Sequence, residues 1–217
     1  MNNYDDLKII KKELKLISYH SYIATFFTNY EYRNKLLLII FIDLELIKII
    51  RSNLDKNILL TKLDWWKISC LESIDGKYYS VPSLRLINKY FKNDSFIKKE
   101  FSILINYLIK YSNTVSYNKK IKFYSKYLLI KNKIIFYIIK SKSYNLNIKR
   151  SLNFLAISKS LSEHNNKELS NKFFYKAKKI CNRPNKKYLI LFLLNSNNYF
   201  TKSNLYKRIF IVFNRGW

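Results

Sequence analysis

The sequence predicts an all-α protein that folds as one helical domain over residues 1–217. Apolar residues return at steps of three and four along almost the whole chain, which is the period of a helix face. Only two glycines and two prolines occur, whereas a β-sandwich or barrel needs many tight turns. Hydrophobic residues make up 48% of the chain, which is enough for a core and too many for a disordered protein.

The N-terminal half contains three predicted helices. The first carries its apolar residues at Leu7, Ile10, Leu14 and Ile17. Residues 35–50 are apolar on nearly every side, which predicts a second helix in a central, buried position. The third has an apolar stripe formed by Leu59, Leu63, Trp66, Cys70 and Ile74. Residues 75–82 then form the clearest loop of the chain.

The C-terminal half continues the helical pattern. Asp94 and Ser95 can cap a helix whose apolar residues are Ile97, Phe101, Leu104, Ile105 and Leu108. After a second loop at residues 111–119, β-branched and aromatic residues weaken the helix prediction for 119–140. A helix at 152–161 and a turn at 162–166 precede a helix with Leu169, Phe173, Ala177 and Ile180 on one face. Asn182, Arg183 and Pro184 end it, and a last helix covers 202–213.

The composition excludes several kinds of site. Gly76 and Gly216 are the only glycines, so a phosphate-binding P-loop and a dinucleotide-binding glycine motif are both ruled out. Cys70 and Cys181 lack the spacing of a metal site, and we interpret them as reduced thiols, with a single disulfide as the alternative. His20 and His164 are isolated, which argues against a metal centre.

The net charge of +27 has two interpretations. Lys, Asn, Ile, Tyr and Phe are abundant while Ala, Gly and Pro are scarce, which is typical of an A/T-rich genome. The other interpretation is selection for a polyanionic partner such as nucleic acid or anionic lipid. No apolar run approaches the roughly 20 residues of a spanning helix, and Asp5 and Asp6 argue against a secretory signal or a transit peptide.

Four segments resemble one known family. They are Leu-Ile-Ile-Phe-Ile-Asp-Leu-Glu-Leu-Ile-Lys-Ile at 38–49, Leu-Thr-Lys-Leu-Asp-Trp-Trp-Lys at 60–67, Leu-Glu-Ser-Ile-Asp at 71–75 and Val-Pro-Ser-Leu at 81–84. The order resembles the squalene/phytoene synthase superfamily, and in particular its short, divergent alphaproteobacterial branch. That branch includes the mitochondrial complex I assembly factor of the superfamily. The resemblance implies a helical bundle of the isoprenoid-synthase type.

The positions that carry the resemblance are Asp43, Glu45, Lys62, Trp65, Trp66, Glu72 and Pro82. Active members of the family hold Mg²⁺ through two Asp-x-x-x-Asp clusters, and the metal binds the prenyl diphosphate. No two of the seven aspartates in this chain are four residues apart. Ile47 and Lys48, or their neighbours, stand where the first cluster is expected. We therefore expect no catalytic residue, no metal site and no cofactor.

Two residue pairs of this region have two interpretations each. Asp43 and Glu45 point to different sides of a helix, where they pair with Lys48 or Arg51, or one of them faces a cavity left from an ancestral active site. Trp65 and Trp66 cannot both face the core. One is therefore expected in the core, and the other is free to line a groove or sit at a membrane interface.

A basic segment near the C-terminus is a candidate anion or membrane patch. It contains Lys172, Lys176, Lys178, Lys179, Arg183, Lys186 and Lys187. Together with the neighbouring Phe173, Phe174 and Tyr175 it could contact RNA or anionic lipid, or it is a solvated helix face.

The function implied by the resemblance is that of a catalytically inactive binding or assembly factor. Its partners would be respiratory complex I subunits or assembly proteins, with an isoprenoid or an anionic lipid surface as a further ligand. The location would be the bacterial cytoplasm or the mitochondrial matrix, at the periphery of the inner membrane. Two alternatives stay open: an active Mg²⁺-dependent prenyltransferase with rearranged metal ligands, and a basic RNA-binding or organellar ribosomal protein.

Overall fold

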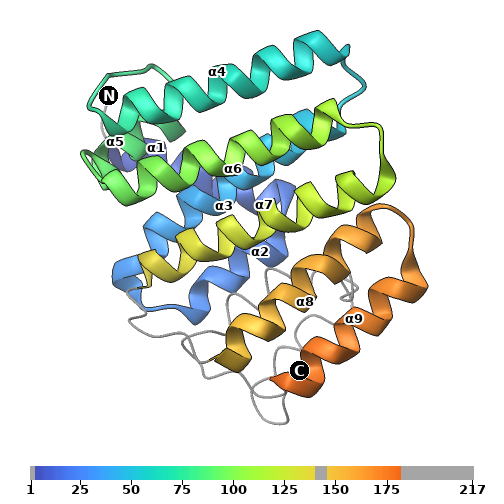
Figure 1. Cartoon of the computed structure of the whole chain (residues 1–217). Helices are drawn as coiled ribbons and strands as arrows, with labels where there is room; N and C mark the ends of the chain where they lie inside the picture. The colour runs from blue at the N-terminus through green and yellow to red at the C-terminus, as the bar shows by residue number, and fades with distance from the viewer. Residues whose placement is uncertain (1–2, 140–145, 182–217) are drawn as a thin grey trace.

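The computed structural model describes residues 3–139 and 146–181 of the chain. Within these ranges it contains nine α-helices, one short 3-10 helix and no strand (Figure 1). The prediction of an all-α protein is therefore confirmed. None of the helices in this part of the chain is both long enough and apolar enough to cross a bilayer.

The N-terminal helices are α1 (Asn3–Ile17), α2 (Tyr19–Ala24), the 3-10 helix η1 (Thr25–Phe27), α3 (Tyr30–Arg51) and α4 (Lys56–Ile74). The remaining helices are α5 (Pro82–Phe91), α6 (Ser95–Asn113), α7 (Tyr117–Ile138), α8 (Leu146–Glu163) and α9 (Lys167–Ile180). Several starts follow from the local sequence. Pro82 occupies the first turn of α5, and the side chain of Asp94 accepts a hydrogen bond from the backbone N–H of Ile97 at 3.0 Å.

Helix α3 lies at the centre of the fold. Seven consecutive residues, Leu36 to Ile42, are buried, as the apolar character of this segment predicts. Helices α1, α4, α5 and α7 all contact α3. Because α3 is enclosed on several sides, the side chain of Asp43 in its C-terminal half lies between helices with only 12% exposed, whereas Lys48 and Arg51 nearer its end are exposed.

A second set of helices packs in chain order. Helix α4 contacts α6, α6 contacts α7, α7 contacts α8, and α8 contacts α9. Figure 1 shows these five helices running in alternating directions across the molecule. The short connection at residues 114–116, between α6 and α7, is shorter than the predicted loop at 111–119, because α6 continues to Asn113 and α7 begins at Tyr117.

Helices α8 and α9 differ most from the prediction. Helix α8 begins at Leu146 rather than Leu152, and Leu169 in α9 is exposed while Ser170 and Ala177 are buried. The hydroxyl of Ser170 donates to the carbonyl of Ser158 at 2.8 Å, so small side chains bring the two helices close together. The predicted helix end at 182–184 and the predicted helix at 202–213 lie outside the described residues.

A buried ion pair joins the first helix to the fifth. Both carboxylate oxygens of Asp6 accept hydrogen bonds from the guanidinium of Arg85, which also donates to the carbonyl of Ser80. The side chain of Asp6 is 0% exposed and that of Arg85 is 8% exposed. The hydrogen bond to Asp6 raises the pKa of Arg85 above its ordinary value. The pair fixes α1 against the start of α5.

Candidate functional site: a central cavity and a tryptophan groove

A cavity of about 630 Å³ lies where the end of α1 and the start of α2 meet α3, α7 and α8. Its charged lining residues are Asp43, Lys48, Arg51, Lys131, Lys159 and Glu163. Its apolar lining includes Ile17, Ile40, Leu44, Ile47 and Leu128. Cavities that hold small molecules typically measure roughly 300–1,000 Å³ and combine an apolar wall with a few polar groups.

Both carboxylates of this cavity already have cationic partners. Asp43 accepts a hydrogen bond from the hydroxyl of Tyr127, and its Oδ2 lies 3.1 Å from Nζ of Lys131. Glu163 pairs with Arg51, with 2.5 Å between Oε2 and Nη2. Burial, followed by the negative charge of Asp43, raises the pKa of Tyr127 well above 10, so its phenol remains a donor. The lone pairs that a metal ion would need are therefore largely used within the protein.

Asp43 thus faces the cavity, which was one of its two interpretations. The other, an ion pair between Asp43 and Lys48 or Arg51, is wrong for this residue, because Lys131 on α7 pairs with Asp43 and Glu163 on α8 pairs with Arg51. These two ion pairs therefore connect α3 with α7 and with α8.

Cations outnumber acids in the cavity wall. Lys48, Arg51, Lys131 and Lys159 line it together with only two carboxylates. Burial first, and the positive charge of Lys131 second, lower the pKa of Lys159 to about 8. An anion that enters the cavity would be attracted by the four cations in its wall.

We expect the stability of the protein to depend on pH through Lys159. The pKa of Lys159 is lowered from an ordinary value of 10.5 to about 8 in the folded state, so the unfolded chain holds this proton more tightly. Unfolding free energy should therefore rise with pH above about 8. From about pH 7 to pH 9, the free energy of unfolding of wild type should increase by about 1.4 kcal/mol more than that of Lys159→Met, as measured by urea denaturation.

The matched control for this measurement is Lys179→Met, which removes the same charge from an exposed position on α9. Its curve of unfolding free energy against pH should run parallel to that of wild type. Parallel curves for Lys159→Met as well would show that the ammonium group of Lys159 is not buried beside Lys131.

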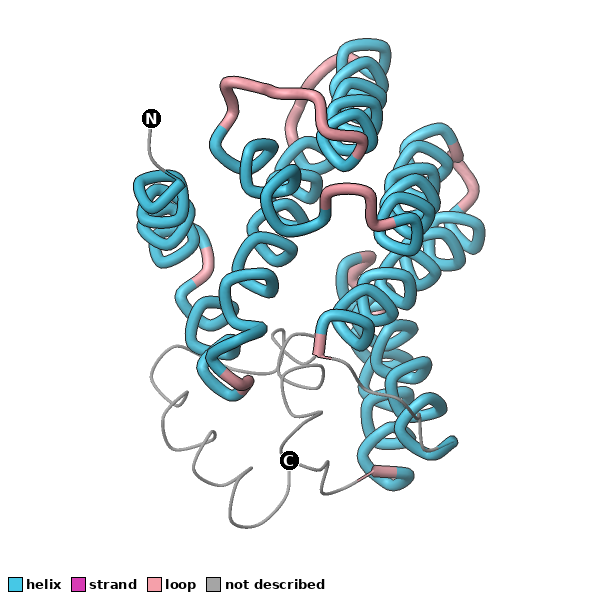
Figure 2. Tube along the Cα trace, turned by 90° about the vertical axis from the view of Figure 1, so that its left-hand side faces the viewer, coloured by secondary structure: helices cyan, strands magenta, loops and turns pink. Residues whose placement is uncertain are grey.

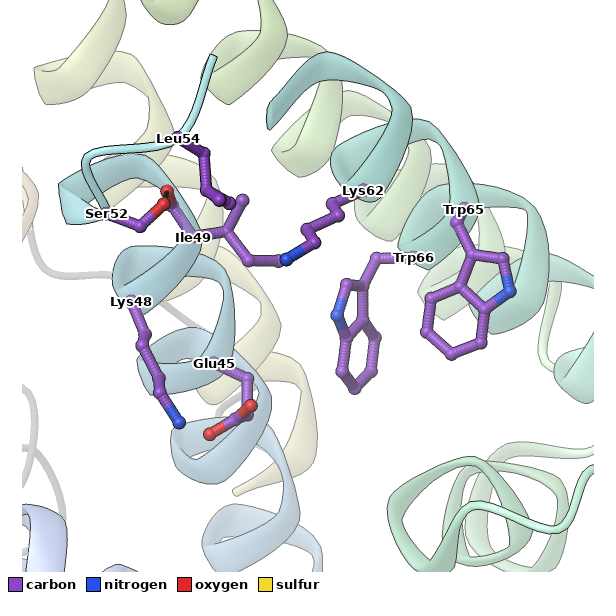
Figure 3. A pocket seen from close by; sticks show the side chains of 8 residues that line it. All are labelled: Glu45, Lys48, Ile49, Ser52, Leu54, Lys62, Trp65 and Trp66. Atoms are coloured by element: carbon purple, nitrogen blue, oxygen red, sulfur yellow. Dashed lines mark hydrogen bonds between the residues drawn. The ribbon is translucent and has the colours of Figure 1, made fainter. Parts of the chain in front are cut away.

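The positions that carry the sequence resemblance gather mainly around a different opening, a groove of about 400 Å³ between α3 and α4. Glu45, Lys62, Trp65 and Trp66 line it, with Lys48, Ile49, Ser52 and Leu54. Figure 3 shows the two indoles projecting from α4 on the same side as Lys48 and Glu45 of α3. Lys48 and Ser52 also line the central cavity, so the two spaces share part of α3 as a wall.

The two tryptophans divide as expected. Trp66 is 8% exposed and Trp65 is 44% exposed, and their rings meet edge to face with centroids 5.5 Å apart. Pro82 lines a smaller neighbouring cavity of about 200 Å³ together with Glu45 and Trp66. Glu72 lines none of these three spaces. Its carboxylate pairs with Lys77 at 2.8 Å and accepts a hydrogen bond from the hydroxyl of Tyr79.

The basic segment of α9 is only partly described. Lys172 pairs with Glu168 at 2.7 Å, and Nζ of Lys176 lies 5.4 Å from the ring centre of Phe173. Lys178 and Lys179 lie in the last turn of the helix. Arg183, Lys186 and Lys187 lie outside the described residues.

The surroundings of Cys70, Cys181 and His164 do not form a metal site within the described residues. Cys70 and Cys181 are not joined in a disulfide, and burial raises the pKa of each. Nδ1 of His164 donates a hydrogen bond to the carbonyl of Ser160 at 2.7 Å, and the imidazole ring packs edge to face against Tyr111. Within residues 3–139 and 146–181, no three His, Cys, Asp or Glu side chains come together as a metal-binding group.

Comparison with known proteins gives no match: no protein-family model, no curated protein and no solved structure is significantly similar to this chain.

Proposed function

We propose that this protein is a non-catalytic binding protein with a scaffold of the isoprenoid-synthase type, and that its central cavity holds an amphiphile with an anionic headgroup. The observation that carries the proposal is the charge of the cavity, where four cations surround two carboxylates that are already paired. An anion can be held directly by such cations. The apolar part of the wall, including Ile40, Leu44 and Leu128, suits a hydrocarbon tail.

The family resemblance supports the same proposal. Ile47 and Lys48 stand near the place of the first acidic cluster of active family members, and both line the cavity. A lysine at this place reverses the local charge, so a diphosphate would bind to the side chains themselves rather than through Mg²⁺. An isoprenoid diphosphate is the ligand that combines the anionic head with an apolar tail of this kind.

We test the cavity by calorimetric titration of the full chain with farnesyl diphosphate, with and without Mg²⁺, at about 150 mM salt. Binding should not require Mg²⁺. Lys159→Met should weaken it by about tenfold or more, because one charged hydrogen bond contributes about 1.5–3 kcal/mol. Lys179→Met, with the same change in net charge, should bind as wild type does.

Other outcomes of this titration separate the alternatives. Binding that requires Mg²⁺, together with release of pyrophosphate, would contradict the proposal and favour the prenyltransferase. Equal weakening by Lys159→Met and Lys179→Met would mean that the general charge of the protein, not the cavity, attracts the ligand.

We also propose, on the resemblance alone, that the protein assists the assembly of respiratory complex I. In this proposal the protein, with or without a ligand in its cavity, would bind complex I subunits or assembly proteins. The measurement is the amount of intact complex I in cells that lack the chain, and an unchanged amount would contradict the proposal.

A further inference from the structure

A connected row of aromatic rings lies where α2, η1 and the start of α3 follow one another. The ring centres of Tyr19 and Tyr22 are 6.4 Å apart. The ring centres of Tyr22 and Phe26 are 5.1 Å apart, and these two rings meet edge to face. Tyr30 begins α3 a few residues later. In Figure 2 this part of the chain follows the N-terminal helix along one edge of the described molecule.

Two cations cover these rings. Nζ of Lys15 lies 4.9 Å from the ring centre of Tyr22. The guanidinium carbon of Arg33 lies 4.5 Å from the ring centre of Phe26 and 5.6 Å from that of Tyr30. The cations therefore rest on the aromatic surface through cation–π contacts, which are individually weak at exposed positions.

The same edge exposes a large amount of apolar surface. Leu16 is 78% exposed, Tyr30 77%, Ile17 49% and Phe26 47%. Five of the fifteen large apolar side chains that are exposed in the described residues lie between positions 16 and 30. A concentration of this kind on one part of a surface marks an interaction site more often than scattered exposed residues do.

We propose that this edge binds the surface of an anionic lipid bilayer. The edge patch consists of Lys15, Leu16, Ile17, Tyr22, Phe26, Tyr30 and Arg33. Aliphatic and aromatic side chains of the patch would enter the headgroup boundary, where tyrosine is favoured. Lys15 and Arg33 would stay at the level of the lipid phosphates, and their charge is complementary to that of the bilayer.

The geometry favours a bilayer over RNA. A protein that binds single-stranded RNA offers open ring faces on which bases stack. Here Lys15 lies against the ring of Tyr22 and Arg33 against that of Phe26, so cations already occupy ring surface. Leu16 and Ile17 add aliphatic surface, which contributes to burial in lipid and offers no stacking face to a base.

The position of the patch also connects it to the central cavity. Ile17 belongs to the patch and lines the cavity together with Ser18 and Ser21. A protein that rests on a bilayer through this edge would hold its cavity close to the place where an amphiphile with an apolar tail resides. This link depends on the proposed function, whereas binding to the bilayer does not.

The test is flotation of the full chain with vesicles of phosphatidylcholine alone or with about 30% phosphatidylglycerol, at about 150 mM salt. Wild type should float with the anionic vesicles. The variant Leu16→Ser/Tyr30→Ser should lower the partition coefficient by about tenfold or more, because it removes two largely exposed apolar groups from the contact. Arg33→Gln should reduce the preference for anionic over neutral vesicles.

The matched control is Ile68→Ser/Val115→Ser, which removes apolar side chains that are 56% and 92% exposed on other parts of the surface. It should float as wild type does, and circular dichroism should show the same helix content in all variants. Equal flotation of the patch variant and the control would overturn the proposal, since binding would then come from the net charge of +27.

Two further results would overturn it as well. A loss of flotation on Tyr175→Ser/Lys179→Gln, with none on the patch variant, would place the lipid contact on α9. A patch variant that loses affinity for a single-stranded RNA oligonucleotide, while its binding to vesicles is unchanged, would make the edge a nucleic-acid site. Failure of farnesyl diphosphate to bind would leave the vesicle result unaffected, so the two proposals fail separately.

Discussion

Asp6→Ala is expected to lower the free energy of unfolding by about 3 to 5 kcal/mol, because it leaves the guanidinium of Arg85 buried without its carboxylate. A loss of this size is a large part of the roughly 5–15 kcal/mol that stabilises a typical domain. It should lower the melting temperature by about 6 to 20 °C in a chain of this length. Urea denaturation followed by circular dichroism measures the free energy directly.

Asp5→Ala is the matched control, because Asp5 and Asp6 both lie in the first turn of α1 while Asp5 is exposed. Each substitution loses the interaction of one carboxylate with the helix dipole, about 0.3–1 kcal/mol, so this contribution cancels in the comparison. Asp6→Leu/Arg85→Leu should recover much of the loss, since no unpaired charge stays buried. Equal losses for Asp5→Ala and Asp6→Ala would contradict the buried ion pair.

The sequence predicts the central elements of this fold because their signals are local. Residues 35–50 are apolar on nearly every side, and a central, buried helix accommodates such a segment. The five predicted stripe residues of α4, from Leu59 to Ile74, are all buried. Asp94 precedes an apolar stripe with helical period and caps α6 as expected. For the segment 119–140 the helix prediction is weakened by β-branched residues, yet α7 is helical up to Ile138 and packs against α6 and α8.

The predicted apolar face of α9 is confirmed at Ala177, which is buried, and Phe173 and Ile180 are half-buried, but the prediction is wrong for Leu169, which is exposed. Ser170, which hydropathy does not select, is buried against α8 instead. The hydroxyl of Ser151 donates to the carbonyl of Ala177 at 2.8 Å, so polar small residues fill this interface. Because serine has low hydrophobicity, a periodicity based on apolar residues does not detect a helix interface of this kind.

The cavity could be predicted only in part. Asp43 was singled out, but its partner Lys131 lies 88 residues away in the chain, and local spacing contains no information on such a pair. A weaker signal did exist. Lys131 continues the buried stripe of Tyr124, Leu128 and Ile135 at helical spacing, and Lys159 falls four residues after the buried Leu155. A lysine at a core position of a helix indicates a buried polar site.

Trp66→Ala is expected to lower the free energy of unfolding by about 3 to 5 kcal/mol, which is the usual result of removing a buried tryptophan and leaving a cavity. Trp66 is 8% exposed and packs in the wall that α4 forms against α3. Trp65→Ala should lower it by only about 0.5–1.5 kcal/mol, because Trp65 is 44% exposed and loses mainly its edge-to-face contact with Trp66. Urea denaturation followed by circular dichroism compares the two variants without relying on tryptophan fluorescence.

The two neighbouring substitutions control for one another, since they delete the same side chain from adjacent positions of one helix. Trp66→Phe should restore more than half of the loss seen with alanine, because the smaller ring still fills most of the cavity. A similar loss for Trp65→Ala and Trp66→Ala would contradict the division into a buried ring at position 66 and an exposed ring at position 65. With the expected division, Trp65 is a side chain of the α3–α4 groove that can be removed while the fold is kept, so its contribution to binding becomes measurable apart from stability.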